Sequence, residues 1–348
     1  MRFVVTGGAG FIGSALVRYL ARELGHEVLN IDKLTYAASD EALRAVADLP
    51  NYGFRKIDIL DAAAVESALM NFRPDGLFHL AAETHVDRSI ATPDVFVETN
   101  VLGTQRLLTA TSNYLKSGAA PEGFRLIHIS TDEVFGELSA DGSDLFTEDT
   151  RYDPRSPYAA SKAASDHFVR AWVNTYHFPA IITNCSNNYG PFQHQEKLVP
   201  LIIKRGLLHQ TMPVYGEGLQ IRDWLHVDDH VRGLFRAFEV GKIGRSYNIG
   251  GNNERRNIEV VTTICESLDR HVPWFDDTGK QRSHSELIAH VTDRAGHDFR
   301  YAIDPTRARN ELGWEPLESF DTGLEKTVMW YIGRSFGGGL PSNGGRGL

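Results

Sequence analysis

Three glycines at three-residue spacing follow an apolar run near the start of the chain. The segment RFVVTGGAGFIGS places Gly7, Gly10 and Gly13 after a predicted strand, and a helix-period segment follows as far as residue 25. Glycine permits a tight turn here, and the start of the helix adds partial positive charge. This order of strand, glycine turn and helix is typical of an α/β domain that holds the pyrophosphate of a dinucleotide.

The next predicted strand, EVLNID, ends in an acid. Asp32 lies 19 residues after Gly13, where a carboxylate can accept hydrogen bonds from both hydroxyls of a ribose. The same carboxylate would repel a 2′-phosphate, so the sequence favours NAD over NADP. Asp58, in KIDILD, is a candidate contact for the adenine ring, and an exposed acid without that role is nearly as consistent with the sequence.

Apolar runs alternate with helix-period segments through the first half of the chain. Strands are expected at 2–7, 27–32, 76–82 and 124–130, with a long helix at 97–116. This alternation predicts a Rossmann-like, doubly wound parallel sheet with helices on both faces and a smaller mixed α/β lobe. We expect an NAD-binding domain at 1–185 with 220–250 returning to it, a substrate-binding lobe at 186–219 and 251–332, and a disordered Gly-rich tail at 333–348.

Composition excludes several classes of protein. The net charge of -9 over 348 residues argues against a broad nucleic-acid-binding surface. Two cysteines are too few for a disulfide framework, and the histidines show no ligand spacing, so we expect no metal. No segment approaches the roughly 18 apolar residues of a membrane span. The first strand begins at once, which leaves no room for a signal peptide, so a cytoplasmic protein is expected.

Tyr158 and Lys162 are four residues apart in SPYAASKAASDHF, so on a helix their side chains share one face. A nearby ammonium and the charge of a nicotinamide would lower the pKa of the tyrosine. The tyrosine could then exchange a proton with a substrate hydroxyl while hydride moves to the cofactor. An amphipathic surface pair is the alternative, but the glycine turn and Asp32 upstream favour catalysis.

The chain is similar to the extended short-chain dehydrogenases/reductases in TGGAGFIG, Asp32, YAASK and a hydroxyl residue at a strand end, here Thr131. Within that family, several segments resemble the nucleotide-sugar 4,6-dehydratases, most closely those that act on dTDP-glucose. These segments are HLAAETHVDRSI, ETNVLGT, ISTDEVFG, NCSNNYGP, EKLVPLII, PVYGEGLQIRDWLHVDDH and DRAGHDFRYAID. The resemblance runs from residue 1 to about residue 330.

The resemblance implies an elimination without net redox change. Oxidation of C4 of the hexose acidifies the C5 proton, and water leaves from C5 and C6. Hydride then returns to C6, and C5 is reprotonated. Glu133 would be the C5 base and Asp132 the acid that protonates the leaving hydroxyl. Thr131 would hydrogen-bond the C4 oxygen, while Tyr158 and Lys162 would carry the oxidation. Adjacent residues of an ideal strand point to opposite faces, so the two acids must lie where the strand ends, and Asp132 needs a raised pKa.

The resemblance also implies further ligand contacts and a homodimer. Cofactor contacts are expected from Gly7, Gly10, Phe11, Ile12, Gly13, Asp32, Lys33, Leu34, Thr35, Asp58, Ile59, Leu80, Ala81, Ala82, Thr84, Thr99, Tyr158, Lys162 and Asn188. Contacts to the nucleotide sugar are expected from Thr84, Thr131, Asn187, Lys197, Leu198, Pro213, Tyr215, Arg222, Asn257 and His297. Arg222 is suited to bidentate phosphate contact, and an ion pair with Asp223 is its alternative. The dimer is expected to form through residues 101–111 and the helix that carries Tyr158.

Three other functions remain open at this point. A nucleotide-sugar 4-epimerase needs the tyrosine, lysine and hydroxyl residue but neither Asp132 nor Glu133. A dehydratase of CDP- or GDP-sugars differs in loop residues that the sequence does not place. A non-catalytic NAD-binding protein could have lost Tyr158, Lys162 or Glu133, yet all three are present.

Overall fold

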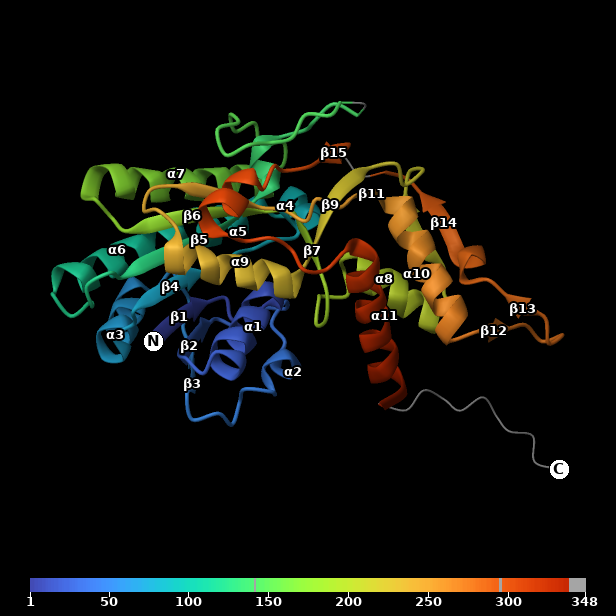
Figure 1. Cartoon of the computed structure of the whole chain (residues 1–348), viewed down its shortest axis with the longest axis horizontal. Helices are drawn as coiled ribbons and strands as arrows, with labels where there is room; N and C mark the ends of the chain where they lie inside the picture. The colour runs from blue at the N-terminus through green and yellow to red at the C-terminus, as the bar shows by residue number, and fades with distance from the viewer. Residues whose placement is uncertain (141, 294–295, 338–348) are drawn as a thin grey trace.

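The computed structural model describes residues 1–140, 142–293 and 296–337 (Figure 1). Its larger part is a seven-stranded sheet in the order β10-β6-β5-β4-β1-β2-β3. All neighbouring strands are parallel, which confirms the predicted fold class. The strands are β1 (Arg2–Thr6), β2 (Glu27–Asp32), β3 (Tyr52–Lys56), β4 (Gly76–His79), β5 (Arg125–Thr131), β6 (Ala180–Cys185) and β10 (Ser246–Ile249).

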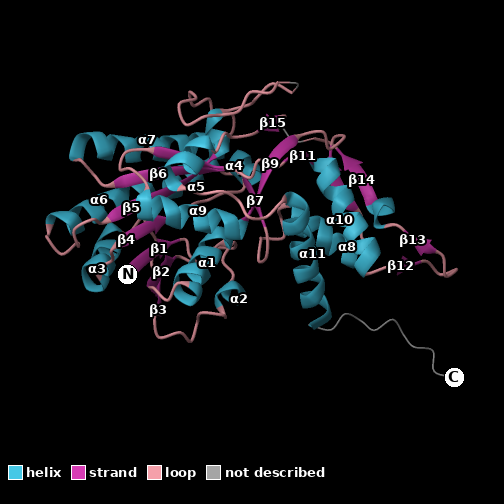
Figure 2. Cartoon of the chain, viewed as in Figure 1, coloured by secondary structure: helices cyan, strands magenta, loops and turns pink. Residues whose placement is uncertain are grey.

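Helices cover both faces of this sheet (Figure 2). Alternate residues of β1 point to opposite faces: Phe3 packs in one core cluster with Leu16, whereas Val4 packs in another with Leu107. The first cluster takes in α1 (Phe11–Arg18), its π-helical continuation (Tyr19–Glu23), α2 (Asp40–Leu43) and α9 (Val227–Val240). The second takes in α3 (Ala62–Phe72), α6 (Thr104–Lys116) and α7 (Pro157–Tyr176).

Short helices connect β4 to α6. They are α4 (Val86–Ala91), α5 (Pro93–Phe96) and a π-helical segment (Val97–Gly103) that runs directly into α6. The helix predicted at 97–116 is therefore confirmed, with its first two turns wound more loosely than an α-helix.

A smaller lobe lies beside the carboxyl end of the sheet (Figure 1). Its central strand is β9 (Ile221–His226), which pairs with β7 (Asn187–Tyr189), β11 (Glu254–Arg256) and β15 (Arg300–Tyr301). Two further pairs join β8 (Met212–Tyr215) to β14 (Ile288–Val291) and β12 (Trp274–Phe275) to β13 (Gln281–Arg282). The helices are α8 (Leu198–Leu207), α10 (Asn257–His271) and α11 (Phe320–Gly337). Short 3-10 segments (Asp132–Phe135 and His284–Leu287) and a π-helical turn (Ala308–Leu312) complete the secondary structure.

Residues 187–189 form β7 because β9 offers a parallel edge for pairing. One local expectation, the extent of the tail, is wrong. Helix α11 continues to Gly337, so residues 333–337 are helical rather than part of a disordered tail. The rest of that predicted tail, 338–348, lies outside the described residues. The domain boundaries stay a prediction, and within the described ranges we find no helix long and apolar enough to cross a membrane.

Candidate active site

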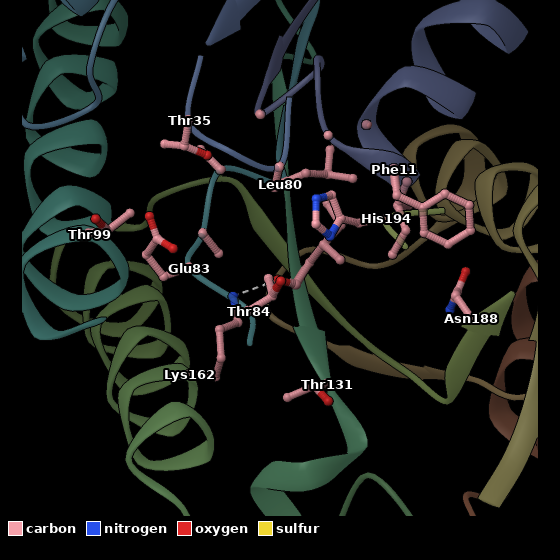
Figure 3. A pocket seen from close by; sticks show the side chains of 18 of the residues that line it. Phe11, Thr35, Leu80, Glu83, Thr84, Thr99, Thr131, Lys162, Asn188 and His194 are labelled. Carbon is pink, nitrogen blue, oxygen red and sulfur yellow. Dashed lines mark hydrogen bonds between the residues drawn. The ribbon is translucent and has the colours of Figure 1, made fainter. Parts of the chain in front are cut away.

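A cavity lies at the carboxyl edge of the seven-stranded sheet (Figure 3). The carboxyl ends of parallel strands share one edge, so residues far apart in the sequence meet there. Gly7 follows β1, Asp32 ends β2, Leu80 follows β4, Thr131 ends β5 and Cys185 ends β6, and all five line the cavity. Strand order reverses at β1: β2 and β3 lie on one side of it, and β4, β5 and β6 lie on the other. Doubly wound sheets open a crevice for ligands at this point.

The glycine turn leaves no space for side chains. Gly7 has a φ of +73°, and a Cβ at this position would lie 2.6 Å from the backbone nitrogen of Ala81. A Cβ at Gly13 would lie 2.1 Å from the carbonyl oxygen of Gly7. Helix α1 begins at Phe11, directly after the turn. This region is therefore a backbone cradle that a phosphate group can approach closely.

Charged side chains at or just after the ends of β2 and β3 also line the cavity: Asp32, Lys33 and Asp58. Asp32 accepts hydrogen bonds from the backbone nitrogens of Ala9 at 2.9 Å and Leu34 at 2.8 Å, which hold its carboxylate at the cavity wall. The Nζ atom of Lys33 lies 3.6 Å from a carboxylate oxygen of Asp58. The cradle and the carboxylate together fit a dinucleotide whose adenosine ribose carries both hydroxyls.

The two adjacent acids lie where β5 ends. After Thr131 the chain turns into the 3-10 segment Asp132–Phe135, so both acids face the cavity. Thr131 Oγ1 donates to Asp132 Oδ1 at 3.2 Å and accepts from the backbone nitrogen of Glu133 at 3.3 Å. The hydroxyl of Thr131 therefore ties the two acids together at the strand end.

Asp132 is almost completely buried, with 2% of its surface exposed. Its Oδ2 atom has no hydrogen-bond partner within the described part of the chain. Burial, followed by the charges of Glu133 and Asp223, raises the pKa of Asp132 well above its usual range. This is the direction expected from the sequence, and it favours a protonated carboxyl that can donate.

Tyr158 and Lys162 lie on α7, which begins after Ser156, whose hydroxyl caps the helix. Both side chains are buried, and Lys162 Nζ donates to the carbonyl oxygen of Ile129 at 2.8 Å. Burial lowers the pKa of Lys162. Without a bound nicotinamide, the pKa of Tyr158 is raised well above its usual value, first by burial and then by the charge of Glu133. The expected lowering depends on the nicotinamide charge as well as on Lys162, so it stays a prediction. The expected lowering took account of the ammonium and the nicotinamide charge, but not of the loss of water around the phenol.

Most of the predicted site residues line this one cavity. They are Gly7, Gly10, Phe11, Ile12, Gly13, Asp32, Lys33, Thr35, Asp58, Ile59, Leu80, Ala81, Ala82, Thr84, Thr99, Thr131, Asp132, Glu133, Tyr158, Lys162, Asn187, Asn188 and Lys197. The other predicted residues are outside its lining: Leu34, Leu198, Pro213, Tyr215, Arg222, Asn257 and His297. Their roles stay predictions.

Arg222, which lies outside the cavity lining, is fixed by contacts with residues 298–301. Its guanidinium donates to the carbonyl oxygens of Phe299 at 3.1 Å and Asp298 at 2.8 Å, and it lies over the Tyr301 ring. Asp223, the partner considered as an alternative, accepts from the backbone nitrogens of Gly251 and Asn253. The charge of Arg222 opposes the rise in the pKa of Asp132, so the two groups interact electrostatically.

Sequence reasoning missed several polar residues of the lining: Glu83, Ser130, Cys185, Ser186, Gln193 and His194. Four of these could have been found, because Glu83 follows β4, Ser130 precedes the last residue of β5, and Cys185 and Ser186 stand where β6 ends. Gln193 and His194 come from the loop before α8, and no sequence pattern indicated that this loop would reach the cavity. Lys197, at the end of the same loop, donates to the carbonyl oxygen of Thr84 at 3.4 Å.

Comparison with known proteins finds a matching family and related dehydratases. Residues 4–327 match the protein family described as GDP-mannose 4,6 dehydratase. The chain is 52% identical over 333 residues to the dTDP-glucose 4,6-dehydratase of Neisseria meningitidis serogroup B, covering 95% of this chain and 93% of that protein. The crystal structure of DesIV, a dTDP-glucose 4,6-dehydratase from Streptomyces venezuelae with NAD bound, has a TM-score of 0.86 and 42% identity, covering 97% of this chain and 98% of that one. The dTDP-glucose 4,6-dehydratase from Bacillus anthracis in complex with NAD has a TM-score of 0.84 and 40% identity, covering 97% and 98%.

Proposed function

This chain belongs to the family described as GDP-mannose 4,6 dehydratase, and we propose that within it the chain is an NAD-dependent hydro-lyase acting on dTDP-glucose. The product is dTDP-4-keto-6-deoxyglucose. The substrate is the one named for the relatives from Neisseria meningitidis, Streptomyces venezuelae and Bacillus anthracis. The two solved relatives also contain NAD.

One observation carries the proposal: Asp132 and Glu133 face the cavity that the glycine cradle, Tyr158 and Lys162 also line. Dehydration needs a base for the C5 proton and an acid for the C6 hydroxyl, close to the groups that oxidise C4. A pair of carboxyl groups in different environments can divide these tasks. Asp132 is buried and Glu133 is partly exposed, so their surroundings differ in this way.

The residues of the cradle suit NAD. Gly7 and Gly13 allow the pyrophosphate to approach the start of α1, and Asp32 can accept from the ribose hydroxyls. Bound NAD supplies reversible acceptance of a hydride and a positively charged ring. Tyr158 is a neutral phenol in the ligand-free protein, so positive charge beside it has to lower its pKa until it releases its own proton. Only the phenolate can then accept the proton of the C4 hydroxyl. Lys162, one turn further along α7, contributes part of that charge.

The elimination then uses the two acids of β5. Glu133 takes the C5 proton, and Asp132 gives its proton to the C6 hydroxyl, which leaves as water. Thr131 is bonded to both acids and lies beside Tyr158, so it can also hold the C4 oxygen during the reaction. Glu133 can later return its proton to C5, which the product requires, so each proton has a donor and an acceptor among these side chains. An acid or base placed in this way contributes about 10²–10⁴-fold in rate.

Incubation of the purified protein with dTDP-glucose and NAD tests the proposal. A 4-keto-6-deoxy sugar, detected by its chromophore in alkali, is expected, and a dTDP-galactose product would instead show 4-epimerisation. Parallel incubations with CDP-glucose, GDP-mannose and UDP-glucose measure nucleotide selectivity. Equal kcat/KM for another nucleotide would contradict the assigned substrate, and no turnover of any sugar would contradict the enzyme assignment.

The proposal includes a cytoplasmic homodimer. Apolar side chains on the helices between β4 and α6 are more than 40% exposed: Ile90, Val95, Val97 and Leu102. All four belong to the segment that leads into α6 and packs against α7. Of these, Leu102 lies within residues 101–111, where the dimer contact was expected. Exposed apolar patches of this kind favour burial against a second protein surface. A cytoplasmic location is supported by two cysteines that are both free and buried.

A further inference from the structure

Asp166 lies on α7 four residues beyond Lys162, and Lys162 lies four residues beyond Tyr158. Side chains at this spacing share one face of a helix, and all three are buried, Asp166 completely. A carboxylate is rarely buried without partners that compensate for its lost hydration. The partners of Asp166 therefore show what this acid does.

Three side chains donate hydrogen bonds to the carboxylate of Asp166. Ser130 Oγ donates to Oδ2 at 2.7 Å, and the Tyr152 hydroxyl donates to the same oxygen at 2.9 Å. His128 Nε2 lies 3.0 Å from Oδ1 and must donate, because an ionised carboxylate only accepts. Burial alone would raise the pKa of Asp166, but these bonds and the charge of Lys162 outweigh burial and lower the pKa. Asp166 is therefore a fixed negative charge inside the protein.

The titratable groups around Lys162 come from every element packed against it. They are Tyr158 and Asp166 on α7, His79 on β4, His128 on β5, Cys185 on β6, and Asp132 and Glu133, which line the same cavity. Burial lowers the pKa of both imidazoles and raises the pKa of the Cys185 thiol, so these three groups are neutral. Burial also opposes the charged form of Lys162 itself, whereas Asp166 raises the pKa of Lys162.

We propose that Asp166 is a positioning residue for the reaction: its buried carboxylate, one turn beyond Lys162, keeps that lysine cationic beside Tyr158. The role in catalysis rests on the proposed function. Lys162 donates to the carbonyl oxygen of Ile129, and Asp166 accepts from the hydroxyl of Ser130, the next residue of β5. Both side chains therefore contact the same stretch of this strand. The lysine thus keeps both its place and its charge although its side chain is buried.

Titration of Lys162 by NMR, with lysine labelled at the ε-carbon, tests this proposal without requiring turnover. Lys162→Arg keeps the charge and identifies the signal by its loss. The wild-type midpoint is expected above neutral pH, despite complete burial. In Asp166→Asn the midpoint should fall by about one pH unit or more. Residues one helical turn apart have Cβ atoms about 5–6 Å from each other, and an opposite charge that close shifts a pKa by about 1–3 units. Glu148→Gln is the matched control, since it removes another buried carboxylate, one that pairs with Arg307 and the backbone of Asn248.

An unchanged Lys162 midpoint in Asp166→Asn would overturn the proposal, as would the same shift in Glu148→Gln. A wild-type midpoint below neutrality would also overturn it, and that measurement needs no variant to fold. The alkaline limb of the pH profile for C4 oxidation should move to lower pH in Asp166→Asn, whereas a merely structural role would lower stability and leave the limb in place. Absence of dehydration in the wild type would contradict the proposed function alone, because the NMR titration would still decide the role of Asp166.

Discussion

Asp132 and Glu133 are consecutive residues, yet both face one cavity, because β5 stops at Thr131 and a 3-10 turn replaces the alternation of a strand. Their surroundings differ. Asp132 is 2% exposed, with one carboxyl oxygen buried and without a donor within the described ranges, whereas Glu133 is only partly buried. Two neighbouring carboxyl groups can therefore be in different protonation states, which an acid and a base acting on one substrate require.

The variant Glu133→Gln tests the role of the base independently of C4 oxidation. This variant keeps the shape of the side chain but cannot take the C5 proton, so dehydration should slow by about 10²–10⁴-fold. C4 oxidation should persist, and reduced cofactor should accumulate after mixing with dTDP-glucose, as followed by its absorbance. Glu239→Gln, which changes an exposed acid paired with Arg236 on α9, should retain wild-type rates. Wild-type turnover in Glu133→Gln would remove the base from the proposed mechanism.

Asp132→Asn should lose activity and gain stability. The pKa of Asp132 in the folded protein is raised, so between its unfolded and folded values the native state holds a proton that the unfolded chain has released. The stability of the wild type therefore falls as pH rises above about 4, the pKa of an unfolded aspartate. An asparagine has no such dependence, so the difference in melting temperature should grow with rising pH. A difference that is constant between pH 4 and pH 8 would show that Asp132 is already ionised in the fold.

Features with local spacing could be predicted from the sequence. The glycine turn, the acid at the end of β2, and the shared helix face of Tyr158 and Lys162 each depend on residues a few positions apart. The long motifs shared with known dehydratases added the roles of Asp132 and Glu133. Because the carboxyl ends of parallel strands share one edge of the sheet, the predicted fold already places these segments together.

Features that depend on distant contacts could not be predicted. The raised pKa of Tyr158 follows from burial, which no local pattern reveals. The anchoring of Asp166 joins residues 36 and 38 positions apart, Ser130 and His128. Strand β7 exists only because Asn187 pairs with Trp224 on β9. An acid four residues beyond Lys162, on the same buried helix face, was the one available signal for the Asp166 network, and its meaning depends on what packs against that face.

The glycine cradle predicts a strong effect of Gly13→Ala. The added Cβ would stand 2.1 Å from the carbonyl oxygen of Gly7, so the turn or α1 must shift. Overpacking of this kind lowers the free energy of unfolding by about 1–3 kcal/mol. NAD binding, measured by calorimetry, should weaken by about tenfold or more because the pyrophosphate loses its close approach to the backbone. Gly333→Ala in α11 meets no atom within 4 Å and should leave NAD affinity unchanged. Equal NAD affinity in both variants would place the pyrophosphate elsewhere.

The exposed apolar segment before α6 predicts that Leu102→Glu weakens the dimer. Leu102 is 42% exposed in the isolated chain. In a symmetric dimer each copy would place the new carboxylate in the contact, so the substitution acts twice. Burying an unpaired carboxylate in an apolar contact costs several kcal/mol. This is enough to yield monomers at micromolar concentration in light scattering. Leu317→Glu, at a leucine that is 77% exposed elsewhere on the surface, is the control and should remain dimeric. A wild-type monomer would contradict the dimer itself, and a dimeric Leu102→Glu would move the contact to another face.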